Sequence, residues 1–354
     1  MSKNELGQFY TTNYKYILSN IKIPSYVKNI IEPFAGNGDL INFIEDKNNY
    51  NIECYDIDPK KDFIKKMDTL KNPPNYDNKF VLTNPPYLAR NKNKNKEIYD
   101  LYSQNDLYKC FIENIINSKC EGGILIIPLN FISSIRKNDI NLRKRFFNKY
   151  YISILNIFEE QVFNDTKYSV ISFLFEKISI NKITKCFVYP SKKHFEFTFY
   201  SNKNYIIGGK IYDLDFNISK YKITRATKET VENNKKNSNI LLKCIDDNHK
   251  NKINLKIVND NKIFIDNTEK LTARSYATLV IEPFIGLNKQ KKLVEEFNKF
   301  INLYREKYNS MFLTNYRESS DIARKRISFR FAFDICKYIL HSLDNNINIY
   351  NLIK

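Results

Sequence analysis

The residues best suited to chemistry in this chain form a short turn in which an asparagine precedes two prolines and a tyrosine. Residues 80–83 are mostly apolar and predict a short buried strand, which the tetrapeptide Asn-Pro-Pro-Tyr follows at 84–87. Because proline lacks the N–H that a sheet needs, the strand must end there in a rigid turn. The side-chain carbonyl of Asn84 and the backbone carbonyl of Pro85 can accept both hydrogens of an aromatic amine and so aim its lone pair at a methyl donor. Tyr87 offers a ring on which an extruded base can stack, although the same residues would also suit a purely structural turn.

Two closely spaced glycines occur earlier, between a predicted strand at 27–31 and a predicted helix that runs through Phe43. Gly36 and Gly38 let the backbone pass close to a ligand. Their spacing lacks a third glycine and a phosphate-binding lysine, which argues against a nucleoside triphosphate and is a weak signal for a dinucleotide. Asp56 follows a second predicted strand about 20 residues later, where an acidic side chain can hold a ribose diol.

Taken together, these motifs resemble those of the S-adenosylmethionine-dependent DNA adenine-N6 methyltransferases, in the gamma-type order. A Gln-Phe-Tyr-Thr element at 8–11 comes first, Glu-Pro-Phe-Ala-Gly-x-Gly at 32–38 comes second, and Asn-Pro-Pro-Tyr comes third. The first element usually ends in Thr-Pro in that family, whereas Thr12 stands at the proline position here. The resemblance covers residues 7 to about 178 and implies S-adenosyl-L-methionine as the cofactor.

The resemblance also implies which residues contact the cofactor. Thr11 would approach its methionine carboxylate, Glu32 its amino group and Ile57 its adenine ring. Asp56 would hold the ribose, and Asp68 would accept a hydrogen bond from the adenine amine. The full implied set is Tyr10, Thr11, Glu32, Phe34, Ala35, Gly36, Asp56, Ile57, Asp68, Asn84 and Pro86.

A second implied set acts on the target base. It consists of Asn84, Pro85, Tyr87 and Phe163. Phe163 would stack on the flipped adenine from the side opposite Tyr87, because its Val-Phe sequence resembles the family loop that carries this aromatic. Tyr168 is the alternative for the same role.

The elements that must position these residues alternate between strands and helices. Apolar runs at 152–158 and 169–175 predict a hairpin, and an amphipathic pattern at 138–150 predicts a helix. With the resemblance, we expect an α/β fold: a Rossmann-like class I methyltransferase sheet with helices on both faces, plus a C-terminal target-recognition domain. The expected domains are a cofactor-binding, catalytic domain at residues 1–178 and a DNA target-recognition domain at residues 179–354.

The second half of the chain lacks motifs with an assigned chemistry. Residues 289–308 predict an amphipathic helix. Arginine gives bidentate contacts to guanine edges and phosphates, and it stands out in a chain dominated by lysine. The expected nucleic-acid contacts are Arg274, Arg317, Arg324, Lys325 and Arg326, although solvated surface arginines would give the same pattern.

Composition favours a polyanionic partner. The 354 residues include 57 Lys and Arg against 39 Asp and Glu, a net charge of +18, although an AT-rich coding sequence would also enrich lysine. Six widely spaced cysteines and three histidines predict reduced thiols and no metal site. No apolar run reaches the ~18–20 residues of a membrane span and the N-terminus lacks an apolar signal core, so we expect no membrane association and a cytoplasmic protein of prokaryotic or viral origin.

The expected function is therefore site-specific methylation of adenine N6 in double-stranded DNA by base flipping, in a restriction-modification system. A cognate restriction endonuclease, encoded separately, is the expected protein partner. Asn84 favours adenine, since cytosine-N4 enzymes more often carry serine before the prolines. The alternatives are a methyltransferase acting on RNA or on cytosine N4 of DNA.

Overall fold

The computed structural model describes residues 7, 9–163, 169–178, 182–208, 211, 219–248, 250–267, 275–308, 311–317 and 324–352, without the side chains of residues 314–317, 324 and 352. The chain divides into two compact units, Met1–Ile206 and Ile207–Lys354.

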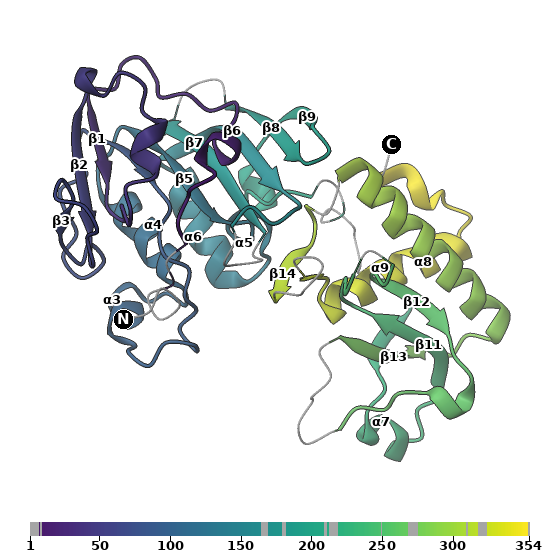
Figure 1. Cartoon of the computed structure of the whole chain (residues 1–354). Helices are drawn as coiled ribbons and strands as arrows, with labels where there is room; N and C mark the ends of the chain where they lie inside the picture. The colour runs from purple at the N-terminus through teal and green to yellow at the C-terminus, as the bar shows by residue number, and fades with distance from the viewer. Residues whose placement is uncertain are drawn as a thin grey trace. The chain divides into compact units, whose positions relative to one another are not determined.

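The described part of the first unit is built on a nine-stranded sheet with the order β3-β2-β1-β4-β5-β7-β6-β8-β9 (Figure 1). The strands are β1 (Asn29–Glu32), β2 (Asn51–Asp56), β3 (Lys65–Lys66), β4 (Phe80–Thr83), β5 (Gly122–Pro128), β6 (Tyr150–Phe158), β7 (Val170–Lys177), β8 (Ile183–Tyr189) and β9 (Lys193–Thr198). β2 and β3 lie on one side of β1, and β4 lies on the other side of β1. All of these strands pair in parallel. Ligands of open α/β sheets bind where the strand order reverses in this way, outside the carboxyl ends of the strands.

Burial explains the composition of the central strands. All residues of β4 and β5 are buried, as expected for strands covered on both faces. Gly123 allows β5 to pack closely, since a Cβ atom there would lie 2.4 Å from the Val81 backbone oxygen. The antiparallel strand β7 then joins β5 to β6 and closes this half of the sheet.

Helices cover both faces of the sheet. Neighbouring residues of β7 point to opposite faces. Ser172 donates a hydrogen bond to the Ile17 backbone oxygen, at the end of α2 (Tyr14–Ile17). Phe173 stacks on Phe131 of α5 (Asn130–Ser133) with ring centroids 6.0 Å apart, and it also contacts Phe146 of α6 (Lys137–Phe147). The predicted α/β class with helices on both faces is confirmed.

The remaining helical segments are short. They are η1 (Leu40–Phe43), η2 (Lys47–Asn49), α3 (Glu97–Tyr102), α4 (Leu107–Asn117) and η3 (Ser201–Lys203). The predicted helix after the glycines is only the 3-10 turn η1, because Ile44 is already extended. α2 stops at Ile17, before Asn20 adopts a left-handed backbone (φ 66°).

The first unit extends beyond the predicted domain boundary at 178/179. β8 pairs in parallel with β6, and β9 pairs antiparallel with β8. Cys186 and Val188 of β8 are completely buried, so this hairpin contributes to the core of the first unit. Pairing with the edge of β6 therefore places the β8–β9 hairpin in the first compact unit, which ends at Ile206. Local sequence patterns do not reveal this pairing.

The second unit contains a four-stranded antiparallel sheet among its described residues, in the order β10-β13-β11-β12. Two long helices, α8 and α9, contact this sheet and each other. Its elements are β10 (Lys222–Arg225), α7 (Lys228–Glu232), β11 (Asn237–Lys243), β12 (Asn254–Ile257), η5 (Asp260–Lys262), β13 (Tyr276–Glu282), α8 (Leu287–Tyr308), β14 (Thr314–Arg317), β15 (Arg324–Arg326), α9 (Phe329–Asp344) and η6 (Ile349–Leu352). The predicted amphipathic helix at 289–308 is confirmed as α8, whose buried face includes Leu293, Phe297 and Phe300.

No helix among the described residues is long and apolar enough to cross a membrane. They also contain no group of three or more His, Cys, Asp or Glu side chains that could hold a metal ion. All six cysteines are free and buried.

Candidate active site

The predicted site residues converge on one edge of the first sheet. Glu32 ends β1, Asp56 ends β2, and Asn84 directly follows β4. Because β2, β1 and β4 run parallel, their carboxyl ends meet at the same edge. Asp68 lies two residues past β3, a two-residue strand that local patterning missed and that pairs in parallel with β2.

Asn84 is held by contacts at both ends of its side-chain amide. Nδ2 donates to the Phe9 backbone oxygen at 2.8 Å and to Thr11 Oγ1 at 3.0 Å. Oδ1 accepts a hydrogen bond from the Tyr87 hydroxyl, which also donates to the Ile126 backbone oxygen at 2.6 Å. The side chain is 8% exposed, so the amide is both oriented and largely shielded from water.

The three aromatic residues near Asn84 pack on one another. The Phe9 ring lies 5.3 Å from the Tyr87 ring and 6.2 Å from the Phe163 ring, measured between centroids. Tyr87 and Phe163 are 4% and 2% exposed. The Tyr87 backbone N–H also donates to the Gly7 backbone oxygen at 2.9 Å, so this early segment is attached to the Asn-Pro-Pro-Tyr turn. In this conformation Phe9 contacts both rings that were expected to hold a base.

Glu32 is a buried carboxyl group at this edge that lacks part of its hydrogen bonding among the described residues. It is 1% exposed, and its Oε2 has no hydrogen-bond partner among the described residues. Burial raises the pKa of Glu32 well above its usual range, and the negative charges of Asp56 and Asp39 raise it further. The site therefore disfavours a bare carboxylate and would be stabilised by a cationic hydrogen-bond donor.

Asp56 fixes the turn that carries the glycines. One of its oxygens accepts from the Gly36 N–H and the other from the Asp58 N–H, both at 2.8 Å. Gly36 has φ 53°, and a Cβ atom there would lie 3.0 Å from the Tyr10 ring, so glycine is required on both counts. Ile57, next to Asp56, is 39% exposed and presents an apolar side chain at the edge.

The other predicted cofactor residues lie around these groups. Asp68 Oδ1 accepts from the backbone N–H groups of Leu70 and Lys71 at 3.2 and 3.1 Å. The Phe34 ring packs edge-on against Phe111 of α4, 5.2 Å between centroids. Ala35, Pro85 and Pro86 are buried, and Thr11 is engaged by Asn84.

The structure describes the predicted nucleic-acid contacts only in part. Arg274 and the alternative base-stacking residue Tyr168 lie outside the described residues, as do the side chains of Arg317 and Arg324. Arg326 is partly buried. Lys325 is 6% exposed, so little of its side chain is accessible in this structure.

Two residues that belong to this edge were not assigned from the sequence. Asp39 has a buried Oδ2 without a hydrogen-bond partner among the described residues, and its charge acts on Glu32. The position of Asp39 directly after Gly38, in the glycine motif, was the sequence feature that could have indicated its place at this edge. Phe9 belongs to the 8–11 element, and nothing in the local sequence indicates that its ring meets residues more than 70 positions away.

The strand order and the residues at the carboxyl edge define a class I methyltransferase fold. Residues 9–163 match the protein family described as Eco57I restriction-modification methylase. This match confirms, for that part of the chain, the resemblance to the restriction-modification DNA methyltransferases.

Several solved structures are distantly similar to the chain. A modification subunit attributed to a type I restriction enzyme of Vibrio vulnificus YJ016 shares 13% identity over 53% of this chain and 49% of that one, with a TM-score of 0.40. A type I methyltransferase subunit from Streptococcus thermophilus shares 14% over 51% and 47%, with a TM-score of 0.38. DrdV, solved in complex with DNA, shares 15% over 68% and 35%, with a TM-score of 0.42. The chain spans about half the length of the first two. No curated protein matches it.

Proposed function

We propose that the chain transfers a methyl group from S-adenosyl-L-methionine to the N6 amine of adenine in double-stranded DNA, after the adenine has left the base stack. The observation that carries the proposal is the oriented amide of Asn84, buried at the same sheet edge as Glu32. The family match of residues 9–163 supports methylation of DNA as the reaction class.

The residues of the edge fit this cofactor. Glu32 Oε2 lacks a donor among the described residues, and the cofactor's ammonium group would supply one. Asp56 and Asp68 place carboxyl groups beside the exposed apolar side chain of Ile57, a combination suited to a ribose and an adenine ring. When bound, the cofactor supplies an electrophilic methyl group.

Asn84 and Pro85 act on the target amine. Asn84 Oδ1 accepts one hydrogen bond from Tyr87, and a carbonyl oxygen can accept a second, from the amine. The Pro85 carbonyl can take the other amine hydrogen, in a direction that the ring of proline restricts. Both acceptors lie in a shielded turn, where electrostatic interactions are stronger than in water.

Adenine in a duplex cannot reach this turn while it is stacked and paired, so the reaction requires base flipping. Tyr87 and Phe163 would hold the flipped base once Phe9 no longer contacts them. The net charge of +18 favours contacts to the flanking phosphates, and the second unit is the proposed target-recognition domain. A separately encoded restriction endonuclease is the proposed partner.

The test is incubation of the full chain with methyl-labelled cofactor and, in separate reactions, duplex DNA, RNA and protein, followed by nucleoside analysis. We expect label in N6-methyladenine from DNA, and less by a factor on the order of 10²–10³ with Asn84→Ala. Label in N4-methylcytosine would refute adenine specificity, and label only in RNA or protein would refute the proposed substrate.

A further inference from the structure

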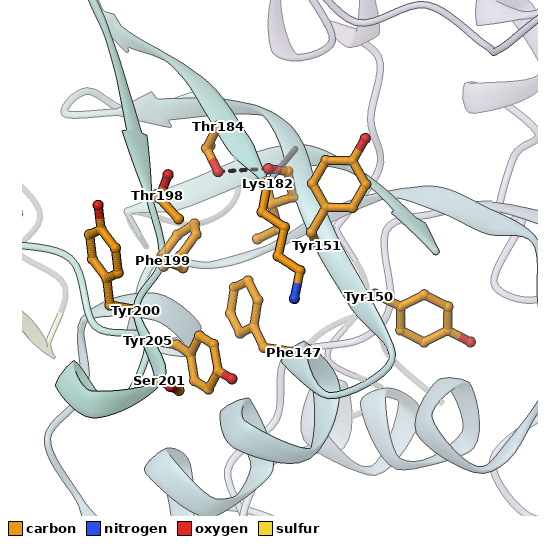
Figure 2. A pocket seen from close by; sticks show the side chains of 11 residues that line it. Phe147, Tyr150, Tyr151, Lys182, Thr184, Thr198, Phe199, Tyr200, Ser201 and Tyr205 are labelled. Carbon is orange, nitrogen blue, oxygen red and sulfur yellow. Dashed lines mark hydrogen bonds between the residues drawn. The ribbon is translucent and has the colours of Figure 1, made fainter. Parts of the chain in front are cut away.

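A pocket lies at the end of the first-unit sheet where β6 and β8 begin, opposite to the carboxyl ends that carry Asn84. Its volume is about 240 Å³. β6 and β8 begin at this pocket, and the pairing pattern makes both strands parallel to β4, whose carboxyl end carries the candidate active site. The pocket is lined by Phe147, Tyr150, Tyr151, Ile152, Lys182, Thr184, Thr198, Phe199, Tyr200, Ser201 and Tyr205 (Figure 2).

Aromatic rings form one side of the pocket. Phe147 stacks on Tyr205 with centroids 4.8 Å apart and planes 4° apart, and it lies 4.7 Å from the Phe199 ring. Tyr200 is 57% exposed at the rim. The loop that carries Tyr205 is held in place by the buried Arg143, whose Nε donates to the Asn204 backbone oxygen at 2.9 Å. The aromatic wall is therefore part of a fixed structure.

Lys182 supplies the one cationic side chain among the lining residues. Figure 2 shows its side chain reaching into the pocket toward Phe147. No described residue forms an ion pair or hydrogen bond with its ammonium group, and the lining contains no carboxylate. The Thr184 hydroxyl donates a hydrogen bond to the Ile152 backbone oxygen at 2.6 Å. Thr198 and Ser201 are further hydroxyl-bearing residues of the lining. This combination favours an anion attached to an aromatic ring.

We propose that this pocket binds a planar aromatic ring that carries an anionic group, of the nucleoside monophosphate class. The base would stack on the aromatic wall, and the phosphate would meet the Lys182 ammonium in a charge-assisted hydrogen bond. Pockets for drug-sized ligands have volumes of roughly 300–1,000 Å³, so this smaller pocket can enclose no more than part of a single nucleotide. The nucleotide can be free in solution or belong to a nucleic-acid strand.

Calorimetric titration of the full chain with thymidine monophosphate tests the proposal, because this probe lacks the adenine that the candidate cofactor site would recognise. We expect saturable binding, weakened about tenfold by Lys182→Gln through the lost charged hydrogen bond. Tyr200→Ala should also weaken binding, and thymidine without phosphate should bind the parent as weakly as the monophosphate binds Lys182→Gln. Lys185→Gln, an exposed lysine of β8 outside the lining, is the matched control and should bind like the parent.

Titrations with a short single-stranded oligothymidine distinguish the two sources. Tighter binding of the oligomer, still dependent on Lys182, identifies a strand as the source, and equal or weaker binding identifies the free nucleotide. The proposal is overturned if thymidine monophosphate does not bind, or if both variants bind it like the parent. It is also overturned if saturating S-adenosylhomocysteine displaces the probe. Unchanged thermal unfolding of the two variants, whose side chains are exposed, excludes misfolding as the cause.

Discussion

The amide of Asn84 makes three contacts in the free protein, two through Nδ2 and one through Oδ1. Its proposed role concerns the target amine, whereas Glu32 and Asp56 are proposed to hold the cofactor. We therefore expect Asn84→Ala to lower the methylation rate by a factor on the order of 10²–10³ and to leave cofactor affinity within a few-fold of the parent. Single-turnover assays and calorimetry measure the two quantities. A large loss of cofactor affinity in this variant would contradict the division of roles.

Phe9 contacts both rings that are proposed to hold the flipped base. The base can stack there only if Phe9 moves, which costs free energy in every binding event. We expect Phe9→Ala to bind the target duplex more tightly than the parent, while Phe9→Leu, which keeps more of the side-chain bulk, changes affinity less. Fluorescence of 2-aminopurine at the methylated position reports the flipped state. Weaker flipping in Phe9→Ala would mean instead that the ring supports the base.

As the proposed partner of the cofactor's ammonium group, Glu32 should couple cofactor binding to pH. Burial raises its pKa, so its neutral form is favoured in the free protein, whereas an ammonium partner requires the carboxylate. Cofactor affinity should therefore rise as pH increases through the raised pKa, and binding should release protons. Calorimetry in buffers of different ionisation enthalpy measures this release. Glu32→Gln should bind weakly and without proton release. If Glu32→Gln released as many protons on cofactor binding as the parent, the protons would come from another group.

At the scale of single elements, Asp106 stands at the start of α4 with its Oδ1 enclosed and lacking a hydrogen-bond partner among the described residues. Burial raises its pKa from 3.8 to about 6, and Lys109 together with the backbone N–H groups of Tyr108, Leu88 and Leu107 offsets only part of that effect. An acid with a raised folded-state pKa adds stability below its unfolded pKa, and this stability is lost as pH rises through the folded value. As the pH rises from about 4 to about 6, ionisation of Asp106 should therefore lower the free energy of unfolding, by at most about 3 kcal/mol in total.

The variant Asp106→Asn tests this assignment. Since the amide stays neutral, we expect it to raise the free energy of unfolding at pH 7.5 by about 1–2 kcal/mol and to leave it nearly unchanged at pH 4. Urea unfolding at the two pH values measures the difference. Asp100→Asn, at an exposed position of α3, is the control and should have little effect at either pH. A destabilised Asp106→Asn at pH 7.5 would show that the carboxylate makes a favourable contact.

At the scale of the whole molecule, the first unit includes the β8–β9 hairpin. Tyr189 of β8 packs on Tyr16 and on Phe158, with ring centroids 5.3 and 5.4 Å apart. A fragment of residues 1–206 should therefore unfold cooperatively, whereas a fragment of residues 1–178 should expose the β6 edge and aggregate. Urea unfolding and gel filtration compare the two.

The same fragments test the division of function between the units. Residues 1–206 contain all the proposed cofactor and catalytic groups, so this fragment should bind S-adenosylmethionine. It should not methylate DNA, because the contacts that offset the cost of base flipping are proposed to lie in residues 207–354. Methylation by residues 1–206 at the rate of the full chain would remove the second unit from target recognition.

Local chemistry in the sequence was sufficient to predict the edge of the sheet that carries the site. Two prolines end β4 whatever surrounds it, Gly36 is needed for a left-handed turn, and parallel strands bring Glu32 and Asn84 to one edge. The tertiary structure alone decided the contacts between distant segments: Phe9 against Phe163, the β8–β9 hairpin on β6, and the burial of Lys325. Such contacts depend on which surfaces meet after the chain has folded, and neither periodicity nor turn chemistry within a short window records that.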